Sequence, residues 1–225
     1  MVRGRATTEP AGRPRARVAD AALVERRRAQ IVEAASRLVA RQGFAKTVVR
    51  DIADEANISV GLVYEYVRSK EDILFLIYEH WAQVAHDGLA KALSEADHPL
   101  QRIDAAVRFL VGLSDAQPDV TFLFYREGGN LSAHGRDLAK KLDRDLAAQI
   151  LEPLQEAVAA GLLRPETDLP MLATSLMVLA HGWVLKGHLL REAHSADDYV
   201  RSVVRTAVVG WATPAGRKAW ERRQP

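Results

Sequence analysis

Residues 47–70 carry the side chains whose types and spacing suit contact with a polyanion. Tyr64 and Tyr66 are large and bear hydroxyl groups that can donate hydrogen bonds to phosphate oxygens. Gly61 has no side chain, so a partner could approach the backbone closely there. Lys70 lies in the first predicted turn of a later helix, where its charge and the free amide groups favour an anion. One such tyrosine alone would more often be a core residue, but the combined spacing favours DNA contact.

Two short helices joined by a tight turn are expected to position these side chains. Apolar residues recur at helical spacing through residues 49–56, and Asn57 then tolerates the left-handed backbone that a tight turn requires. Ser59 suits the N-cap of a second helix that ends near Tyr66, with Val63 on its inner side. The pattern predicts a helix-turn-helix.

The second of these helices offers few groups for reading base edges. It contains no Arg, Lys, Asn or Gln, the residues that make bidentate contacts to guanine and adenine. Arg50 is therefore the best candidate for a guanine contact, while Val60 or Leu62 could touch thymine methyl groups. Glu65 either accepts a hydrogen bond from cytosine or is solvated. We expect DNA shape and water to carry an unusual share of the specificity. The predicted DNA-binding set is Thr47, Arg50, Ser59, Val60, Gly61, Leu62, Tyr64, Tyr66 and Lys70.

The charge distribution also favours a DNA-binding first third. Residues 1–70 carry 14 Lys and Arg against eight Asp and Glu, whereas the remaining 155 residues carry 17 against 21. Residues 1–22 hold five arginines and are predicted to be a disordered basic arm that either touches DNA or only solvates the chain. No apolar segment follows this arm, so the protein is predicted to be cytoplasmic. The longest uncharged part of the apolar stretch near the C-terminus, residues 171–185, is too short to span a membrane, and no membrane partner is expected.

The whole chain is predicted to be all-α. Apolar residues keep the helical period without strand–helix alternation or internal repeats, although residues 120–125 alone could form a strand. About nine helices are expected, three of them in a DNA-binding domain over residues 23–70. The others would form a larger ligand-binding and dimerisation domain over residues 71–214, followed by a C-terminal tail over residues 215–225.

An all-α enzyme is the main alternative, but enzyme motifs are not found in the sequence. The chain has no cysteine, which excludes a disulfide framework, a thiolate metal site and a cysteine nucleophile. It also has no HExxH pair, nucleophile elbow, phosphate-binding loop or dinucleotide glycine motif. His181 and His188 have no carboxylate at metal-site spacing, and we expect no metal, cofactor or catalytic residue. A non-specific architectural DNA-binding protein is a second alternative, although residues 71–225 are acidic.

The sequence resembles the TetR family of bacterial transcription regulators from residue 31 to residue 74. The resemblance rests on Ile31–Ala35, Gly43–Phe44, Arg50-Asp51-Ile52-Ala53, Glu55-Ala56, Ile58-Ser59, Gly61, Tyr64, Tyr66 and Ser69-Lys70-Glu71-Asp72-Ile73-Leu74. It implies a homodimer whose two recognition helices enter successive major grooves of an inverted-repeat operator in double-stranded DNA. It also implies that a small molecule binding in the second domain releases the DNA, with repression as the family default.

Three features depart from the family pattern. Val48 and Val49 stand where the family usually places a threonine for phosphate contact, and Thr47 would supply a hydroxyl one position earlier. Asn57 replaces the usual glycine of the turn, and Val67 replaces a usual phenylalanine. These departures put individual phosphate contacts in doubt, not the fold.

Aromatic and other apolar residues of the middle helices could line a ligand pocket, although such residues at helical spacing are more often plain core. Tyr125, Glu127, His181 and His188 are candidate polar contacts, and each could equally make a structural hydrogen bond. The candidate ligand-binding residues are Trp81, Phe109, Phe122, Tyr125, Glu127, Met177, His181 and Trp183.

The last two helices carry more apolar surface than one core face requires. As in the resembled family, they would form a four-helix interface between two copies of the chain. A buried helix in a monomer is the alternative. The candidate interface residues are Leu172, Leu179, Leu189, Val203, Ala207 and Trp211.

A looser pattern resembles the branch of the TetR family that responds to acyl-CoA thioesters. It consists of Phe124-Tyr125-Arg126-Glu127 with Leu131, Trp183 with Lys186, and Asp198-Tyr199-Val200 with Gly210. An acyl chain would match an apolar pocket, and Arg126, Lys140 or Lys186 could meet the CoA phosphates. A drug-like or other hydrophobic effector is the alternative.

Overall fold

The computed structural model describes residues 21–131, 133–206 and 210–222. Within these ranges the chain forms eleven α-helices and one 3-10 helix, and its only β-type pairing is an isolated bridge between Leu163 and Ala212. The predicted all-α class is confirmed, and residues 120–125 are helical rather than extended. The predicted basic arm lies outside the described residues as far as residue 20. None of the described helices is long and apolar enough to cross a membrane.

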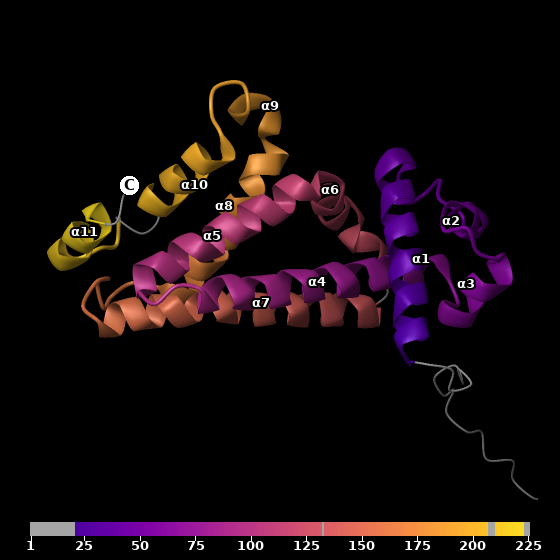
Figure 1. Cartoon of the computed structure of the whole chain (residues 1–225), viewed down its shortest axis with the longest axis horizontal. Coiled ribbons are helices and arrows are strands. Elements are labelled where there is room, and N and C mark those ends of the chain that lie inside the picture. The colour runs from indigo at the N-terminus through magenta and orange to yellow at the C-terminus, as the bar shows by residue number, and fades with distance from the viewer. Residues whose placement is uncertain (1–20, 132, 207–209, 223–225) are drawn as a thin grey trace, which may run out of the picture. The chain divides into compact units, whose positions relative to one another are not determined.

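The chain divides into two compact units, one extending to Ile73 and the other starting at Leu74. The helices of the first unit are α1 (Ala21–Gln42), α2 (Val49–Glu55) and α3 (Val60–Tyr66), followed by the first residues of α4 (Lys70–Ser94). The second unit continues α4 and adds α5 (Pro99–Ala116), α6 (Pro118–Glu127), the 3-10 helix η1 (Gly128–Asn130), α7 (Ala133–Ala159), α8 (Leu169–Leu185), α9 (Gly187–Leu190), α10 (Ala196–Val204) and α11 (Pro214–Glu221). Figure 1 labels the helices in chain order.

Local sequence signals set the helix boundaries of the first unit. Helix α1 ends where Gly43 takes a left-handed φ of 81°. Asn57 takes φ of 52° in the turn between α2 and α3, which confirms the predicted left-handed position. The Ser59 hydroxyl oxygen accepts a hydrogen bond from the Leu62 N–H at 3.2 Å and caps α3, as predicted. The buried residues of this unit include Ile31, Ala34, Ala35, Leu38, Val39, Ile52, Ala53, Val63, Val67 and Ile73.

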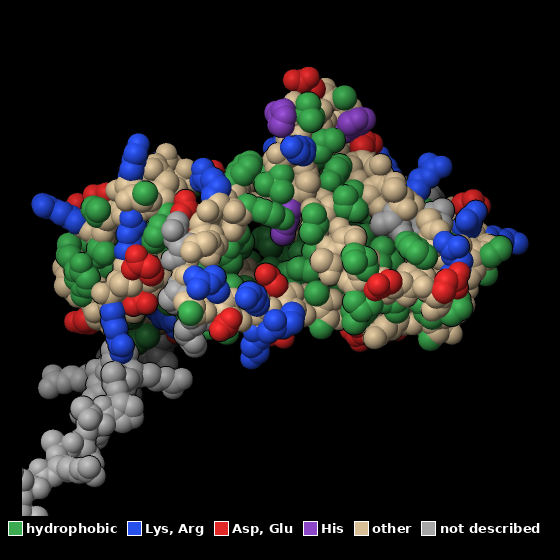
Figure 2. Space-filling model, turned by 180° about the vertical axis from the view of Figure 1, so that it is seen from behind, with side chains coloured by type: hydrophobic (Ala, Val, Ile, Leu, Met, Phe, Trp, Pro, Cys, Tyr) green, Lys and Arg blue, Asp and Glu red, His purple; other side chains and the backbone are tan. Residues whose placement is uncertain are grey.

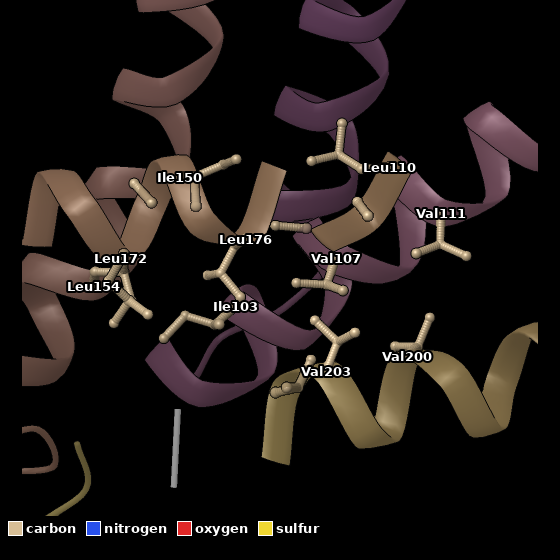
Figure 3. Close-up of a cluster of buried hydrophobic side chains, with 14 of the residues drawn as sticks. Ile103, Val107, Leu110, Val111, Ile150, Leu154, Leu172, Leu176, Val200 and Val203 are labelled. Atoms are coloured by element: carbon tan, nitrogen blue, oxygen red, sulfur yellow. The ribbon is translucent and has the colours of Figure 1, made fainter. Parts of the chain in front are cut away.

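Helix α5 is the central helix of the second unit and packs against α7, α8 and α10 (Figure 1). Figure 3 shows the side chains that meet there: Ile103, Val107, Leu110 and Val111 from α5, Ile150 and Leu154 from α7, Leu172 and Leu176 from α8, and Val200 and Val203 from α10. Two capping groups orient the partner helices. Asp168 accepts from the Met171 N–H at the start of α8, and Ser195 forms a capping box with Asp198 at the start of α10.

The residues expected to form a C-terminal tail are instead largely helical, which corrects that prediction. Helix α11 starts after Thr213, whose hydroxyl oxygen accepts from the Gly216 N–H at 3.0 Å. Trp220 is buried in the core of the second unit. A Cβ atom at Gly216 would lie 2.0 Å from the Leu162 carbonyl oxygen, so this close approach requires glycine. The Thr213-Pro214 pair at the start of α11 is a helix-start signal in the sequence.

Candidate DNA-binding surface and ligand cavity

Polar contacts tie the helix-turn-helix to α1. Glu55, at the end of α2, accepts hydrogen bonds from Arg37 Nε at 3.0 Å and from Arg41 Nη2 at 2.7 Å. Hydrogen bonding to Arg37 and then to Arg41 lowers the pKa of the Glu55 carboxyl group. Gln30 Nε2 donates to the carbonyl oxygen of Ala56 at 2.5 Å. These contacts fix α2, and through the turn α3, against a long helix.

Helix α3 presents a mostly apolar outer face with one prominent hydroxyl group. Tyr64 is 55% exposed, whereas Tyr66 is half-buried. Gly61 is also exposed, and a Cβ atom there would meet only the Ser59 hydroxyl oxygen, at 4.0 Å. Arg50 is exposed at the start of α2. The remaining predicted contacts on this helix-turn-helix, Ser59, Val60 and Leu62, are exposed or half-buried.

Thr47 does not belong to this surface, and its predicted role is corrected. Its side chain is 1% exposed, and its hydroxyl group donates to the carbonyl oxygen of Gly43 at 3.0 Å. The hydroxyl group therefore stabilises the loop after α1 and cannot reach a phosphate. The neighbouring residue Val48 is 50% exposed, but its side chain cannot form a hydrogen bond to a phosphate.

Lys70 makes contacts within the first unit that the sequence did not indicate. Its Nζ atom donates to the carbonyl oxygen of Ala45 at 2.9 Å and lies 4.4 Å from the ring centroid of Phe44. The Lys70 ammonium group therefore stabilises the loop between α1 and α2. An ammonium group has three N–H donors, so Lys70 keeps donors for a phosphate as well.

The second unit contains an inner cavity of about 100 Å³ between α4, α5, α6, α7 and α8. Most of its lining side chains are apolar, and Tyr78, Asp143 and His181 are its titratable groups. Its lining residues are Tyr78, Trp81, Ala82, Ala85, Leu110, Leu113, Ser114, Gln117, Val120, Thr121, Phe124, Ala139, Leu142, Asp143, Leu146, Met177 and His181.

An outer groove of about 410 Å³ adjoins the inner cavity, because five residues line both: Tyr78, Phe124, Asp143, Met177 and His181. The groove adds Tyr125, Arg144, Ala147, Thr174 and Val178. Figure 2 shows a hollow on one face of the molecule bordered by hydrophobic side chains and a histidine. Both spaces are lined mostly by apolar side chains, and the groove adds the charged Arg144.

The polar groups around these spaces are largely engaged with one another. The Tyr78 hydroxyl donates to the carbonyl oxygen of Phe124 at 2.8 Å, and burial, with the nearby Asp143 charge, raises the pKa of Tyr78 to about 12. The Tyr125 hydroxyl lies 3.0 Å from His181 Nδ1. Burial lowers the pKa of His181, so this imidazole is neutral at pH 7.

The structure brings together half of the predicted ligand-binding residues. Trp81, Met177 and His181 line the inner cavity, and Tyr125 lines the outer groove. Phe109, Phe122, Glu127 and Trp183 line neither space, which corrects those four predictions.

Physical reasons for the misplaced residues are visible in two cases. Trp183 is buried in the core, where its indole Nε1 donates to Asp115 Oδ1 at 2.9 Å. Phe109 lies on the side of α5 that meets Gly88 of α4, away from the cavity. A helical stripe of apolar residues does not reveal which neighbouring helix it will face.

Sequence reasoning missed Tyr78, Asp143 and Arg144, although all three line the groove. Tyr78 follows other apolar residues of α4 at helical spacing, a pattern that is typical of ordinary core. Asp143 and Arg144 lie in a charged stretch of α7 that is typical of a solvated helix face. The cations expected to meet CoA phosphates, Arg126, Lys140 and Lys186, are exposed and line neither space.

The predicted interface residues divide into two groups. Leu179, Leu189 and Trp211 are exposed, and so they are available to a partner. Leu172 and Val203 pack inside the chain's own core instead, which corrects those two assignments (Figure 3). Both helices are apolar on more than one side, and the sequence does not say which side faces inward. Ala207 lies outside the described residues.

The exposed side of α8 carries further apolar residues. Met171 is 63% exposed and Val178 is 54% exposed, on the same side of the helix two turns apart. Val178 also lines the outer groove, whereas Met171 does not. Among the described residues, no group of three or more His, Asp or Glu side chains could hold a metal ion.

Comparisons with known proteins agree with this architecture. The family model described as bacterial regulatory proteins, tetR family, matches residues 31–77. The HTH-type transcriptional regulator HbdR of Aromatoleum sp. (strain CIB) is 33% identical over 202 residues, which cover 90% of this chain and 88% of HbdR.

Solved structures share the fold at lower identity. The transcriptional regulator FadR from Bacillus subtilis, solved in complex with stearoyl-CoA, matches with a TM-score of 0.70 and 17% identity over 81% of this chain and 98% of its own. AibR, solved in complex with isovaleryl coenzyme A and operator DNA, matches with a TM-score of 0.67 and 18% identity over 81% of this chain and 98% of its own. The chain therefore belongs to the tetR family of bacterial regulatory proteins, and it is a DNA-binding regulator of transcription rather than an enzyme.

Proposed function

We propose that the protein is a cytoplasmic, homodimeric repressor that binds an inverted-repeat operator and releases it when an acyl-CoA thioester occupies the second unit. The observation that carries this proposal is the inner cavity with its adjoining outer groove. A mostly apolar cavity that continues into an open groove with Asp143 and Arg144 in its wall matches an acyl group joined to a long polar carrier.

The DNA-binding part of the proposal rests on the exposed face of the helix-turn-helix. Arg50 and Tyr64 are exposed there, and Lys70 keeps N–H donors for a phosphate. Two copies related by a two-fold axis would present this face to two half-sites one helical turn apart. The exposed side chains of Met171 on α8 and Leu189 on α9 belong to the surface through which the copies would pair.

The ligand part rests on the chemistry of the groove. Arg144 lines the groove and is exposed, so it could meet an anionic group of the carrier. Lys140 lies one turn before it on α7 and could extend the contact to a second phosphate. FadR and AibR, which share the fold, were solved with CoA thioesters bound.

The proposal is tested by selecting double-stranded DNA from a random pool with the full chain. We expect enrichment of an inverted repeat, and steep salt dependence without any such sequence would instead indicate an architectural DNA-binding protein. The selected DNA is then challenged with a panel of acyl-CoA thioesters, the matching free acids, CoA alone and drug-like hydrophobic compounds. Release by a thioester but not by CoA alone would support the effector class, and release only by a drug-like compound would contradict it.

A matched pair of variants sharpens the second step. Arg144→Gln should weaken the response to the thioester while leaving operator affinity unchanged, because it removes a cation from the groove alone. Lys141→Gln removes the same charge from an exposed neighbouring position that does not line the groove. An equal response in the two variants would contradict a phosphate contact by Arg144.

A further inference from the structure

Glu65 is the one charged side chain of α3, the second helix of the helix-turn-helix, and it is an acid in a unit that must approach phosphates. It is exposed, as is Gly61 one turn earlier. Among the described residues, the ion pairs of this unit lie within α1 or join α1 to Glu55, and none involves Glu65. The negative charge of Glu65 therefore stands on the surface of the helix without a neighbouring cation in an ion pair.

Helix geometry places Glu65 and Gly61 at the centre of the outward face of α3. Val63 is 0% exposed and marks the side that packs against the rest of the unit. An α-helix turns about 100° per residue, so the residues two positions before and after Val63 lie roughly 200° around the helix from it. Gly61 and Glu65 thus share the side opposite Val63, where residues four positions apart are neighbours. The surface over Gly61 is open, since a Cβ atom there would meet only the Ser59 hydroxyl oxygen, at 4.0 Å.

The outward face is the one that a helix-turn-helix places in the major groove. Because Gly61 has no side chain, the helix backbone can approach the base edges closely at that point. The neighbouring Glu65 carboxylate then comes close to the base edges as well and loses part of its water. A carboxylate that loses water without gaining a donor is destabilised, so the base pair that faces Glu65 decides whether binding is favourable there.

The major groove offers a suitable donor chiefly on cytosine. A carboxylate can only accept hydrogen bonds. Guanine presents two acceptors, thymine presents one, and adenine presents its amino group beside the acceptor N7, whereas cytosine presents its N4 amino group without an acceptor of its own. A guanine or thymine that faces Glu65 therefore repels it, and so do the phosphates of a duplex that is bound out of register.

We propose that Glu65 is a specificity-determining residue, which accepts a hydrogen bond from a cytosine N4 amino group in each half-site and weakens binding to other DNA. The inference rests on the proposed function, in which the protein selects an operator. Its consequence is that one acid lowers the general affinity of α3 for DNA while it raises discrimination at one base pair.

The first experiment selects double-stranded DNA from a random pool with the full chain, as wild type and as Glu65→Gln. Wild type should enrich cytosine at one position of each half-site. Glu65→Gln should shift that position from cytosine to adenine, because glutamine makes a bidentate contact to adenine N6 and N7. Glu65→Asp keeps the charge on a shorter side chain. Its Kd ratio between duplexes with and without this cytosine should fall by about tenfold, since a hydrogen bond to a charged group is lost.

The second experiment measures binding to a shuffled duplex of the same base composition at a fixed salt concentration. Glu65→Gln should bind this duplex about fivefold more tightly than wild type does, which is the size of the repulsion between two unit charges about 4 Å apart in water. Glu65→Asp should bind it as wild type does. Glu33→Gln is the matched control, because it removes the same charge from an exposed position of α1 in the same unit. It should keep the base preference and stay within about twofold of the wild-type affinity for the shuffled duplex.

Two results would overturn the proposal. One is a base preference that is the same in wild type, Glu65→Gln and Glu65→Asp at every position of the half-site. The other is an equal gain in affinity for the shuffled duplex in Glu65→Gln and Glu33→Gln. A wild type that enriches no inverted repeat contradicts the proposed function instead, and the shuffled duplex then still decides whether Glu65 weakens general binding to DNA.

Discussion

The Tyr125 hydroxyl lies 3.0 Å from Nδ1 of His181, and this contact joins α6 to α8 where the outer groove meets the inner cavity. The two rings meet edge to face, with centroids 5.7 Å apart. Because Nδ1 is engaged by Tyr125, Nε2 is the ring nitrogen that His181 can offer to a ligand. The pair therefore links two helices at the wall of the outer groove.

The pH dependence of stability should report the burial of His181. Its pKa in the folded protein is lowered from its ordinary value by burial, so the unfolded chain binds this proton more readily. The stabilising contribution of the neutral imidazole is present above the unfolded pKa of about 6.5 and is lost as the pH falls through that value toward the folded pKa. We expect wild type to lose stability as the pH falls below about 6.5, and His181→Gln to lose less.

The matched control for this measurement is His188→Gln, at an exposed position. Urea unfolding curves at a series of pH values would give the three profiles. If His181→Gln and wild type fall in parallel across this window, the burial of a neutral imidazole is not what makes stability depend on pH.

Arg50→Ala should weaken operator binding and relax the preference at one base pair of each half-site. A bidentate contact from arginine to guanine contributes about 1–3 kcal/mol of discrimination, and α3 offers no other side chain of that kind. Arg217→Ala, an exposed arginine on α11, is the control for loss of charge. Binding to a panel of operators with single substitutions measures the preference, and an unaltered panel would remove Arg50 from base recognition.

Thr47→Val should destabilise the first unit by about 1 kcal/mol without changing which operator is preferred. The substitution removes the hydroxyl that donates to the Gly43 carbonyl oxygen at 3.0 Å, and the side chain is buried away from any ligand. Denaturant unfolding and operator binding are measured on the same sample. A shift in base preference with unchanged stability would contradict the structural role.

Asn57→Ala should also destabilise the protein, by about 1 kcal/mol, because alanine tolerates a φ of 52° poorly. Asn57→Gly should stay within about 0.5 kcal/mol of wild type, since glycine accepts this conformation but has a more flexible unfolded chain. The midpoints of urea unfolding for the two variants give the comparison. Equal midpoints would mean that the turn relaxes to another conformation when its residue changes.

Met171→Glu and Leu189→Glu should make the chain monomeric and weaken operator binding steeply. Both side chains are more than 60% exposed, so a carboxylate there would be buried only if a second copy covered it. Ala148→Glu places the same charge on an exposed site of α7 and should leave the assembly unchanged. Sedimentation velocity gives the molar mass, and a dimer that persists in both variants would place the interface elsewhere.

The first unit could be predicted closely because its signals are local. Asn57 acts through its own backbone conformation and Ser59 through a capping bond to the residue three positions later, and the structure confirms both predictions. Thr47 was misplaced because its partner is the loop itself. A hydroxyl beside a helix start suits a phosphate and a nearby carbonyl equally well, and only the three-dimensional path of the loop decides between them.

The second unit was predicted as a set of helices but not as a set of contacts. The apolar period identifies which residues are buried, whereas the helix that each stripe meets depends on packing between distant segments. Phe109 and Trp183 do pack among apolar residues, but the prediction that they line the ligand cavity is wrong. Asp143 could not be recognised because a charged residue on a polar helix face gives no sign that a hollow lies beside it.

Few positions of helix α8 can be substituted without an effect on the core, the cavity or the outward side of the helix. One side packs in the core through Leu176 and Trp183, a second side forms the cavity through Met177 and His181, and the outward side carries Met171. A substitution library across Leu169–Leu185 should therefore contain far fewer silent positions than one across the polar face of α7. New effector specificities would then arise more readily from α7, whose contribution to the cavity can change without disturbing either the core or the assembly.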